Sequence, residues 1–222
     1  MRASRTICKR NGAVVSEPGL TAAGLPAGGR LFIPQGYEPG YDYPLVVWLA
    51  DRGAAFDFDR AMARVSLRNF VAVQPGGSGE AAVWRAIDAV RGRLSIHAGR
   101  IFLVGRGAAG SEAFRIGCRD PRRFAGVVSL AGRFPLDESL FARLDAVRRL
   151  PMLLCCRASA APADACQIDR TLRLFHAAGG ALAVRIYPQG RGLSRAMLGD
   201  VNRWIMGEVC GPPERVRSPL AT

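Results

Sequence analysis

The sequence predicts a single α/β domain built on a mostly parallel sheet with helices on both faces. Strand and helix patterns alternate along the chain, and most strand patterns are short, continuously apolar and rich in Val, Leu or Ile. Strands covered on both faces by helices have this composition, and their alternation with helices is typical of parallel sheets. The length of 222 residues suits one domain with a full core.

Seven strands are expected at residues 30–34, 44–49, 69–74, 100–104, 125–130, 151–156 and 182–187. Apolar side chains at helical spacing predict helices over residues 83–94, 168–175 and 198–209. Asp137 and Ser194 are candidate N-caps. Residues 30–209 are therefore the expected domain, with a partly irregular arm at 1–29 and a flexible Pro- and Arg-rich tail at 210–222.

The strongly basic charge is expected to reflect composition. The chain has a net charge of +13, and Lys9 is the only lysine among its 31 basic residues. The arginines are spread along the sequence beside abundant Ala and Gly, and no basic block stands out, so we do not expect nucleic-acid binding. No apolar run is long enough to span a bilayer, and residues 1–29 contain no secretory signal. We therefore expect a cytoplasmic protein.

The cysteines are expected to be buried free thiols. They are Cys8, Cys118, Cys155, Cys156, Cys166 and Cys210, and no C-x-x-C pair occurs. Cys155 and Cys156 are adjacent in a strand pattern, so their side chains should face opposite sides of the sheet and should not share a metal. No cluster of His, Asp or Glu has ligand spacing, so no metal site is expected. Free thiols agree with a reducing compartment.

A glycine-rich turn follows the fourth strand pattern and leads into a helix. Gly105, Gly107 and Gly110 match G-x-G-x-x-G, the dinucleotide-binding fingerprint. That fingerprint normally follows the first strand of its unit and has an acidic residue about 20 positions later. Here the turn lies in mid-chain, and the next strand ends in Ala131, Gly132 and Arg133. Because an arginine can hold a 2′-phosphate, NADP binding stays an alternative, although no cofactor is our first expectation.

A second interpretation covers about four-fifths of the chain. The segments that carry it are residues 30–34, 43–49, 70–75, 100–105, 120–128, 132–135, 150–154 and 187–190, in order and with suitable spacing. Through them the chain resembles the carboxylesterase/phospholipase and polyhydroxybutyrate-depolymerase-like branch of the α/β-hydrolases. The resemblance implies the α/β-hydrolase fold, with the turn at Gly107 as its nucleophile elbow.

The resemblance also implies that the catalytic triad is degenerate. The elbow of this family reads G-x-S-x-G, and its serine falls on Gly107, which has no side chain. The histidine falls on Arg191, whose guanidinium stays protonated and cannot accept a proton. The acid matches Ala160, and residues 158–161 contain no carboxylate. The oxyanion segment L-H-G is altered at residues 49–53, so no catalytic residue is expected.

The altered site has one positive feature. Arg52, Arg106 and Arg191 should lie around the N-terminus of a helix that starts near Ala108. Helix N-termini and guanidinium groups both favour anions, so these residues and Gly107 form a candidate anion site. The alternative is that they are ordinary solvated arginines in an arginine-rich chain.

The expected function is that of a degenerate carboxylesterase-like protein (a pseudoenzyme) that binds or scaffolds a small anionic ligand or a protein partner. The alternative is a weak or rewired esterase acting on small acyl esters. Substitute residues for such an enzyme would have to come from Ser111, His97, His176, Asp164 and Asp169. Ser111 is expected one turn into the helix, His97 in the loop before the elbow strand, and His176 late in a helix, so none forms a credible triad.

Overall fold

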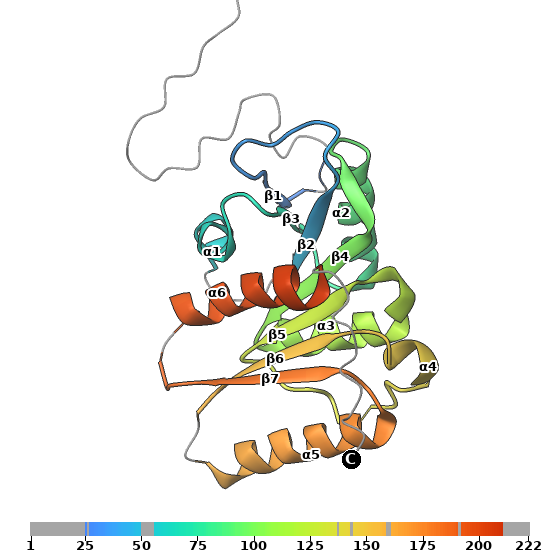
Figure 1. Cartoon of the computed structure of the whole chain (residues 1–222), viewed down its shortest axis with the longest axis vertical. Helices are drawn as coiled ribbons and strands as arrows, with labels where there is room; N and C mark the ends of the chain where they lie inside the picture. The colour runs from blue at the N-terminus through green and yellow to red at the C-terminus, as the bar shows by residue number, and fades with distance from the viewer. Residues whose placement is uncertain are drawn as a thin grey trace, which may run out of the picture.

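A twisted seven-stranded sheet runs through the molecule (Figure 1). The computed structural model describes residues 25, 27–49, 56–136, 138–142, 144–158, 161–190 and 192–210. Most of the predicted arm, most of the predicted tail and the predicted N-cap Asp137 therefore lie outside the described residues. The strands are β1 (Arg30–Phe32), β2 (Tyr43–Leu49), β3 (Val71–Gln74), β4 (Ile96–Arg106), β5 (Gly126–Leu130), β6 (Met152–Arg157) and β7 (Leu182–Tyr187).

The sheet has the order β1-β3-β2-β4-β5-β6-β7. All neighbouring strands are parallel except β1, which pairs with β3 in the antiparallel direction. The predicted mostly parallel sheet and all seven predicted strands are confirmed. Because six strands are parallel, their carboxyl ends meet at one edge of the sheet, where open α/β sheets place their sites.

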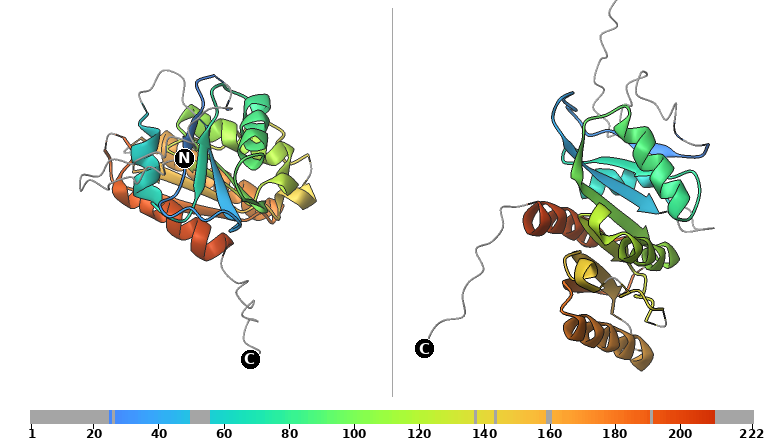
Figure 2. Two further views of the ribbon diagram at one scale, coloured as in Figure 1. Left: turned by 90° about the horizontal axis from the view of Figure 1, so that it is seen from above. Right: turned by 90° about the vertical axis from the view of Figure 1, so that its right-hand side faces the viewer.

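Helices cover both faces of the sheet, as Figures 1 and 2 show. They are α1 (Phe58–Val65), α2 (Glu80–Arg91), α3 (Ala108–Arg119), α4 (Leu144–Val147), α5 (Pro162–Ala178) and α6 (Arg195–Arg203), with a 3-10 turn η1 (Pro121–Arg123) and a π-helical end η2 (Trp204–Val209). One core lies under α1 and α6, and the other lies under α2, α3 and α5. Ser194 caps α6 as predicted, since its side chain accepts a hydrogen bond from the Met197 N–H.

The fourth strand begins earlier than predicted, and this corrects the position of His97. The apolar run predicts a strand from residue 100, but β4 begins at Ile96, so His97 lies in the strand and not in the loop before it. None of residues 96–100 is fully buried, and this first half of β4 lacks the apolar pattern of a covered strand. It pairs with β2 only through Tyr43 and Ile96, across a register shift, before regular pairing starts at Ile101.

The prediction of buried free thiols is confirmed at three cysteines; Cys210 is half-buried, and Cys8 lies outside the described residues. Cys155 packs in the core under α6 and Cys156 in the core under α5, so the two side chains do face opposite sides of the sheet. Cys118, Cys155 and Cys156 are buried free thiols, but Cys166 is exposed on α5. Among the described residues, no helix combines the length and the apolar character that a membrane crossing requires.

Candidate functional site

The turn at Gly107 has the geometry of a nucleophile elbow. It joins the end of β4 to the start of α3, and Gly107 has φ 56° and ψ −125°, a conformation that side chains other than glycine adopt only under strain. The Gly107 N–H donates to the Leu130 carbonyl at 2.9 Å, which fixes the turn to the end of β5. The Gly107 carbonyl accepts from the Gly110 N–H at 3.0 Å. The elbow expected from the sequence is therefore present as a backbone structure.

Two neighbouring glycines let the elbow close. A Cβ on Gly105 would lie 2.1 Å from the Ala109 carbonyl oxygen, so only glycine lets the strand approach the helix here. A Cβ on Gly110 would lie 2.3 Å from Ser129 Oγ. The glycine motif therefore serves helix-to-strand packing in this chain, which is one of the roles that glycines have in tight strand-to-helix turns.

The N-terminus of α3 has the features of an anion site. Ala108 is exposed, and the first turn contains no acidic residue. Within the described part of the chain, the N–H groups of Ala108 and Ala109 have no acceptor, as is usual for the first turn of a helix. Arg106 is half-buried beside Trp48, Leu49 and Phe56, at the end of β2. Three of the five candidate anion ligands, Arg106, Gly107 and Ala108, are thus brought together.

The remaining candidate positions lie outside the described residues. They are Arg52, Ala160 and Arg191. The strands that precede them end at the same edge as the elbow: Leu49 of β2 pairs with Gly105, and Arg157 of β6 pairs with Tyr187 of β7. The strands that precede the three residues therefore end at the elbow edge, and the positions of Arg52, Ala160 and Arg191 themselves stay a prediction.

The substitute residues do not assemble a triad. Ser111 lies in the first turn of α3, where its hydroxyl donates to the Arg133 carbonyl at 2.6 Å and so has no described general base. His97 follows Ile96, which pairs with Tyr43 at the start of β2, so His97 lies about 20 Å from the elbow, at the other end of the sheet. His176 lies in the last turn of α5, about 20 Å from the end of that helix that faces the elbow edge. Asp164 is paired with Arg133 at 2.5 Å, and Asp169 is paired with Arg173.

A pocket of about 280 Å³ adjoins the elbow at the carboxyl ends of β5 and β6. Its wall includes Gly132, which lies so close to the elbow that an added Cβ would come within 2.4 Å of the Gly107 carbonyl oxygen. Cys156 also lines the pocket, and burial raises the pKa of its thiol to about 11, so it stays protonated. The Arg133–Asp164 ion pair lies in this lining too. Sequence reasoning missed this pocket because three separate elements form it.

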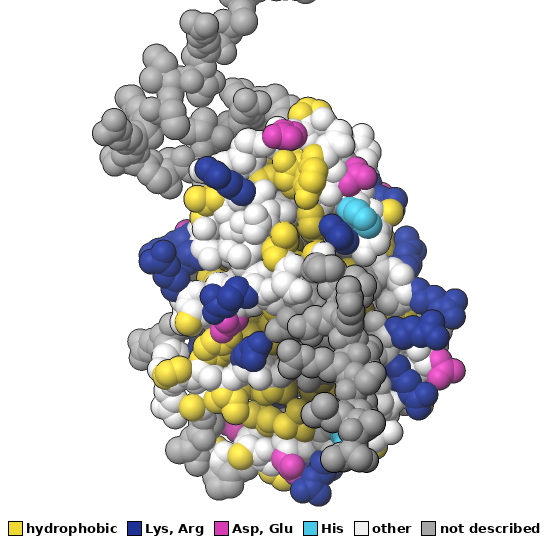
Figure 3. All heavy atoms as spheres, viewed as in Figure 1, with side chains coloured by type: hydrophobic (Ala, Val, Ile, Leu, Met, Phe, Trp, Pro, Cys, Tyr) yellow, Lys and Arg dark blue, Asp and Glu magenta, His cyan; other side chains and the backbone are white. Residues whose placement is uncertain are grey.

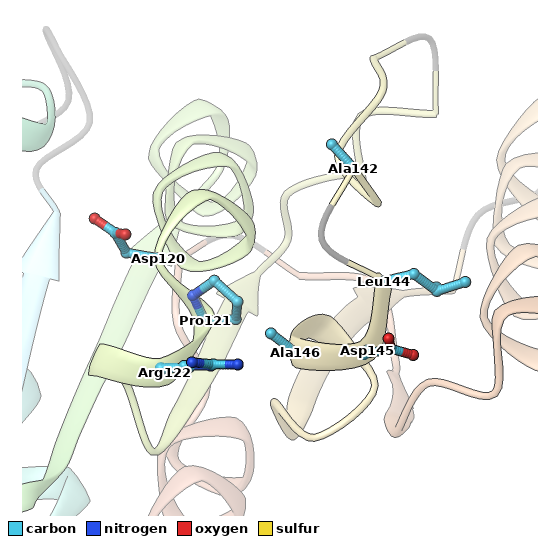
Figure 4. Close-up of a pocket in the computed structure, with 7 residues that line it drawn as sticks. All are labelled: Asp120, Pro121, Arg122, Ala142, Leu144, Asp145 and Ala146. Carbon is cyan, nitrogen blue, oxygen red and sulfur yellow. The ribbon is translucent and has the colours of Figure 1, made fainter.

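A larger cavity lies away from the elbow. Its volume is about 540 Å³, and its lining includes Pro121, Arg122 and Leu144 (Figure 4). Asp120, the first of its lining residues, follows the carboxyl end of α3, whereas the elbow is at the amino end of that twelve-residue helix. The two sites are therefore about 18 Å apart along the helix. Arg122 and Asp145 give this cavity mixed charge, and its lining includes no residue of the elbow.

The strand order argues against the dinucleotide-binding alternative. In the doubly wound dinucleotide fold, the glycine-rich turn follows the first strand, and the later strands lie on both sides of it. Here the glycine-rich turn follows β4, with β5 to β7 on one side and the earlier strands β1 to β3 on the other. The structure therefore has a different topology around the same glycine pattern.

No family model and no curated protein matches the chain. Solved structures do match. A thermostable esterase has 17% identity and a TM-score of 0.56 over 80% of this chain, and the match spans 54%, or about half, of the esterase. The Staphylococcus aureus fluorophosphonate-binding serine hydrolase F has 11% identity and a TM-score of 0.61 over 82% of this chain and 91% of that one. Thermogutta terrifontis esterase 2, phosphorylated by paraoxon, has 14% identity and a TM-score of 0.58 over 84% and 90%.

At identities this low, the likeness concerns the fold. The order of the strands, the antiparallel first strand and the tight turn with positive φ after β4 agree with it. The fold implied by the sequence resemblance is thus the fold that the structure has: this chain is a single-domain protein of the α/β-hydrolase fold.

Proposed function

We propose that this chain is a catalytically degenerate member of its fold, a carboxylesterase-like pseudoenzyme that binds a ligand at the elbow and does not hydrolyse an ester. One observation carries the proposal. The residue with elbow geometry is Gly107, so the position from which a nucleophilic hydroxyl would attack holds no side chain. Acyl transfer through a triad needs a nucleophile, a base and an acid that orients the base. The resemblance places Arg191 and Ala160 at the other two positions.

The proposed ligand is a small anion, such as a carboxylate or a phosphate. Support comes from the N-terminus of α3, where exposed Ala108 and half-buried Arg106 lie together and no acidic residue occupies the first turn. The retained elbow offers a further reason. Gly107 adopts the elbow conformation at little cost, so the backbone N–H groups keep the orientation that stabilises negative charge in active relatives of this fold.

The first test is intact mass after incubation with a fluorophosphonate probe. We expect no adduct on the native chain, because Gly107 has no side chain and Ser111 donates its hydrogen bond to the Arg133 carbonyl and not to a base. We expect an adduct on Gly107→Ser combined with Arg191→His, and a slower one or none on Gly107→Ser alone. The relative rates of adduct formation test the assignment of Gly107 to the nucleophile position and of Arg191 to the base position. Only the double variant restores a nucleophile together with a proton acceptor.

A stoichiometric adduct on the native chain would contradict the proposal and would favour the alternative, a rewired esterase. Ser111→Ala is the matched control, since Ser111 is the described serine nearest in sequence to the elbow. Loss of the adduct in Ser111→Ala would identify the nucleophile, and turnover of a small acyl ester would then be measured on the same variants.

The second test concerns the anion. Thermal unfolding is measured with inorganic phosphate and with acetate, and a ligand that binds the native state raises the midpoint as its concentration grows. We expect stabilisation of the native chain and its loss in Arg106→Gln. Arg122→Gln is the control, because it removes an equal charge at the distant cavity. Equal responses of the two variants would indicate a general effect of charge and would contradict an elbow site.

A further inference from the structure

The strand β7 is an open edge of the sheet. It is the last strand in the order, and it pairs with β6 in unbroken register from Leu182 to Tyr187. The opposite edge is β1, which has only three residues. Figure 3 shows hydrophobic side chains gathered between α5 and α6, where β7 runs. Ile186 is 62% exposed, the highest value among the large hydrophobic side chains of the described residues.

Among the described residues, a regular row of hydrogen-bonding groups on the backbone of β7 has no partner. The carbonyls of Ala181 and Tyr187 accept hydrogen bonds from the Met152 and Ala158 N–H groups, so the odd-numbered residues direct their backbone toward β6. Backbone direction alternates along a strand, and the N–H and C=O groups of Leu182, Val184 and Ile186 therefore point away from the sheet. Long, flat edges of this kind are templates for pairing with another strand.

The usual devices that protect a sheet edge are nearly absent here. Proteins blunt open edges with short strands, prolines, bulges or several charged residues. β7 has six residues, no proline, no register shift and a single charged residue, Arg185. The three residues whose backbone groups point away from the sheet are Leu182, Val184 and Ile186. Their side chains all lie on the face of the sheet that α5 covers, since alternate residues of a strand share a face.

We propose that two copies of this chain pair through their β7 strands, antiparallel and centred on Val184, so that the sheet continues from one copy into the other. In this register Val184 faces Val184 of the second copy, and Leu182 faces Ile186 on either side. All three pairs join residues whose backbone groups point outward, so each pair exchanges two hydrogen bonds. The exposed Ile186 side chain is covered by Leu182 of the second copy.

The charges on the edge favour this register. With Val184 at the centre, Arg185 faces Ala183 of the second copy and meets no charge of its own sign. With Arg185 at the centre, two guanidinium groups face each other directly, which is destabilising. A centre on Ala183 leaves Ile186 without a partner. The side-chain order of β7 is thus self-complementary in one antiparallel register, and this is why we choose a second copy as the occupant.

The test is site-directed disulfide formation combined with mass measurement in solution. The background replaces Cys8, Cys166 and Cys210 with serine, because these are not buried thiols of the described core. In the proposed register, two Val184→Cys residues have Cα atoms about 5.5 Å apart, within disulfide range. Two Ile186→Cys residues are about 14 Å apart, which is too far. We expect fast, near-complete cross-linking of Val184→Cys and little of Ile186→Cys.

The comparison of Val184→Cys with Ile186→Cys is informative because random collisions would give the opposite order of cross-linking rates. Ile186 is more exposed than the half-buried Val184, so unspecific oxidation would link Ile186→Cys faster. Arg185→Cys reports the alternative register centred on Arg185. Without cross-linking, the native chain should form a concentration-dependent dimer by light scattering, and Ile186→Lys should remain a monomer. Tyr41→Lys, at an exposed residue far from β7 in the fold, should dimerise like the native chain.

Three results would overturn the proposal. One is a native chain that stays monomeric at every accessible concentration. Another is cross-linking of Ile186→Cys or Arg185→Cys at least as fast as that of Val184→Cys. The third is a dimer that forms only after residues 211–222 are deleted, which would identify this segment of the same chain as the occupant of the edge.

Discussion

At Gly107, a serine would have to adopt a strained backbone conformation that glycine adopts freely. With φ at 56° and ψ at −125°, a Cβ at this position is in a sparsely populated region. We expect Gly107→Ser to lower the free energy of unfolding by about 1–3 kcal/mol, the usual cost of such a conformation. Urea unfolding followed by circular dichroism measures the change.

The matched control for this change is Gly190→Ser. Gly190 has no positive φ, and a Cβ added there meets nothing within 4 Å. This control should unfold within about 0.5 kcal/mol of the native chain, as surface changes usually do. If Gly107→Ser and Gly190→Ser lowered the free energy of unfolding by the same amount, a side chain at Gly107 would not strain the elbow.

Gly110 is a second position where the elbow depends on a missing side chain. Alanine inside a helix is normally more stable than glycine by up to about 1 kcal/mol. At Gly110 the added Cβ would lie 2.3 Å from Ser129 Oγ, so we expect Gly110→Ala to destabilise by about 1–3 kcal/mol, as overpacking does. Gly199→Ala in α6 should show the opposite sign, because its Cβ meets only the Arg203 side chain at 3.6 Å.

The Ser129 side chain is the atom group that an added Cβ at Gly110 would meet, so a change at Ser129 should recover part of the stability lost in Gly110→Ala. Its side chain is fully buried, and its Oγ has no hydrogen-bond partner among the described residues. Ser129→Ala should therefore be neutral or stabilise by about 1 kcal/mol, and it should reduce the cost of Gly110→Ala in the double variant. Strict additivity of the two changes in urea unfolding would show that the two side chains do not meet.

The glycines of the elbow could be predicted from the sequence, but their neighbours could not. A tight strand-to-helix turn demands small residues at Gly105 and Gly110 wherever it occurs, and this demand is local. Ser129 and Gly132 close on the elbow from β5 and the loop after it, more than 20 positions away. Their roles depend on the strand register, which only the folded chain defines.

Among the elements, the covered strands were predictable and the uncovered half of β4 was not. The residues from Ile101 to Val104 are buried on both faces and carry a continuous apolar run. Residues 96–100 are half-buried or exposed and have no continuous apolar run, and Ile96 pairs with Tyr43 of β2. A continuous apolar run indicates a strand that is buried on both faces, so it does not predict a strand end that is not buried.

Between β7 and α6, a hydrogen bond couples stability to pH. The Tyr187 hydroxyl donates to Asp200 Oδ2 at 2.6 Å, and this bond lowers the pKa of the Asp200 carboxyl below its ordinary value. A carboxyl whose folded pKa is lowered contributes stability that is complete above its unfolded pKa of about 4 and is lost as the pH falls through the folded pKa. Burial raises the pKa of the Tyr187 hydroxyl, so it remains a donor.

We therefore expect Tyr187→Phe to lower the free energy of unfolding by about 2 kcal/mol near pH 7, the usual value for a hydrogen bond to a charged group. The difference from the native chain should shrink as the pH falls below about 4. Urea unfolding across this range measures it, with Tyr37→Phe as a control at a tyrosine whose hydroxyl accepts from the Ser95 N–H. A difference that stays constant with pH would contradict the coupling to Asp200.

For the whole molecule, the sequence order alone determined where the candidate site must lie. Alternating strands and helices predict a parallel sheet, and a parallel sheet gathers the loops after β2, β4, β6 and β7 at one edge. The elbow and its neighbours Arg106 and Ala108 were found there. The pocket beside Cys156 and the open edge at β7 were not predicted, since both follow from which strands are neighbours and which strand comes last.

The net charge of the molecule gives a last prediction, which separates the two proposals. Each copy carries +13, so two copies repel each other, while an anion at the elbow is attracted. Raising the ionic strength from about 0.1 M to about 1 M shortens the screening length from about 10 Å to about 3 Å. We expect the β7 dimer to strengthen over this range, measured by sedimentation equilibrium, because its contacts are apolar side chains and backbone hydrogen bonds. Phosphate binding at Arg106 should weaken over the same range. A dimer that dissociates in salt would mean that ion pairs hold the copies together, which pairing centred on Val184 does not provide.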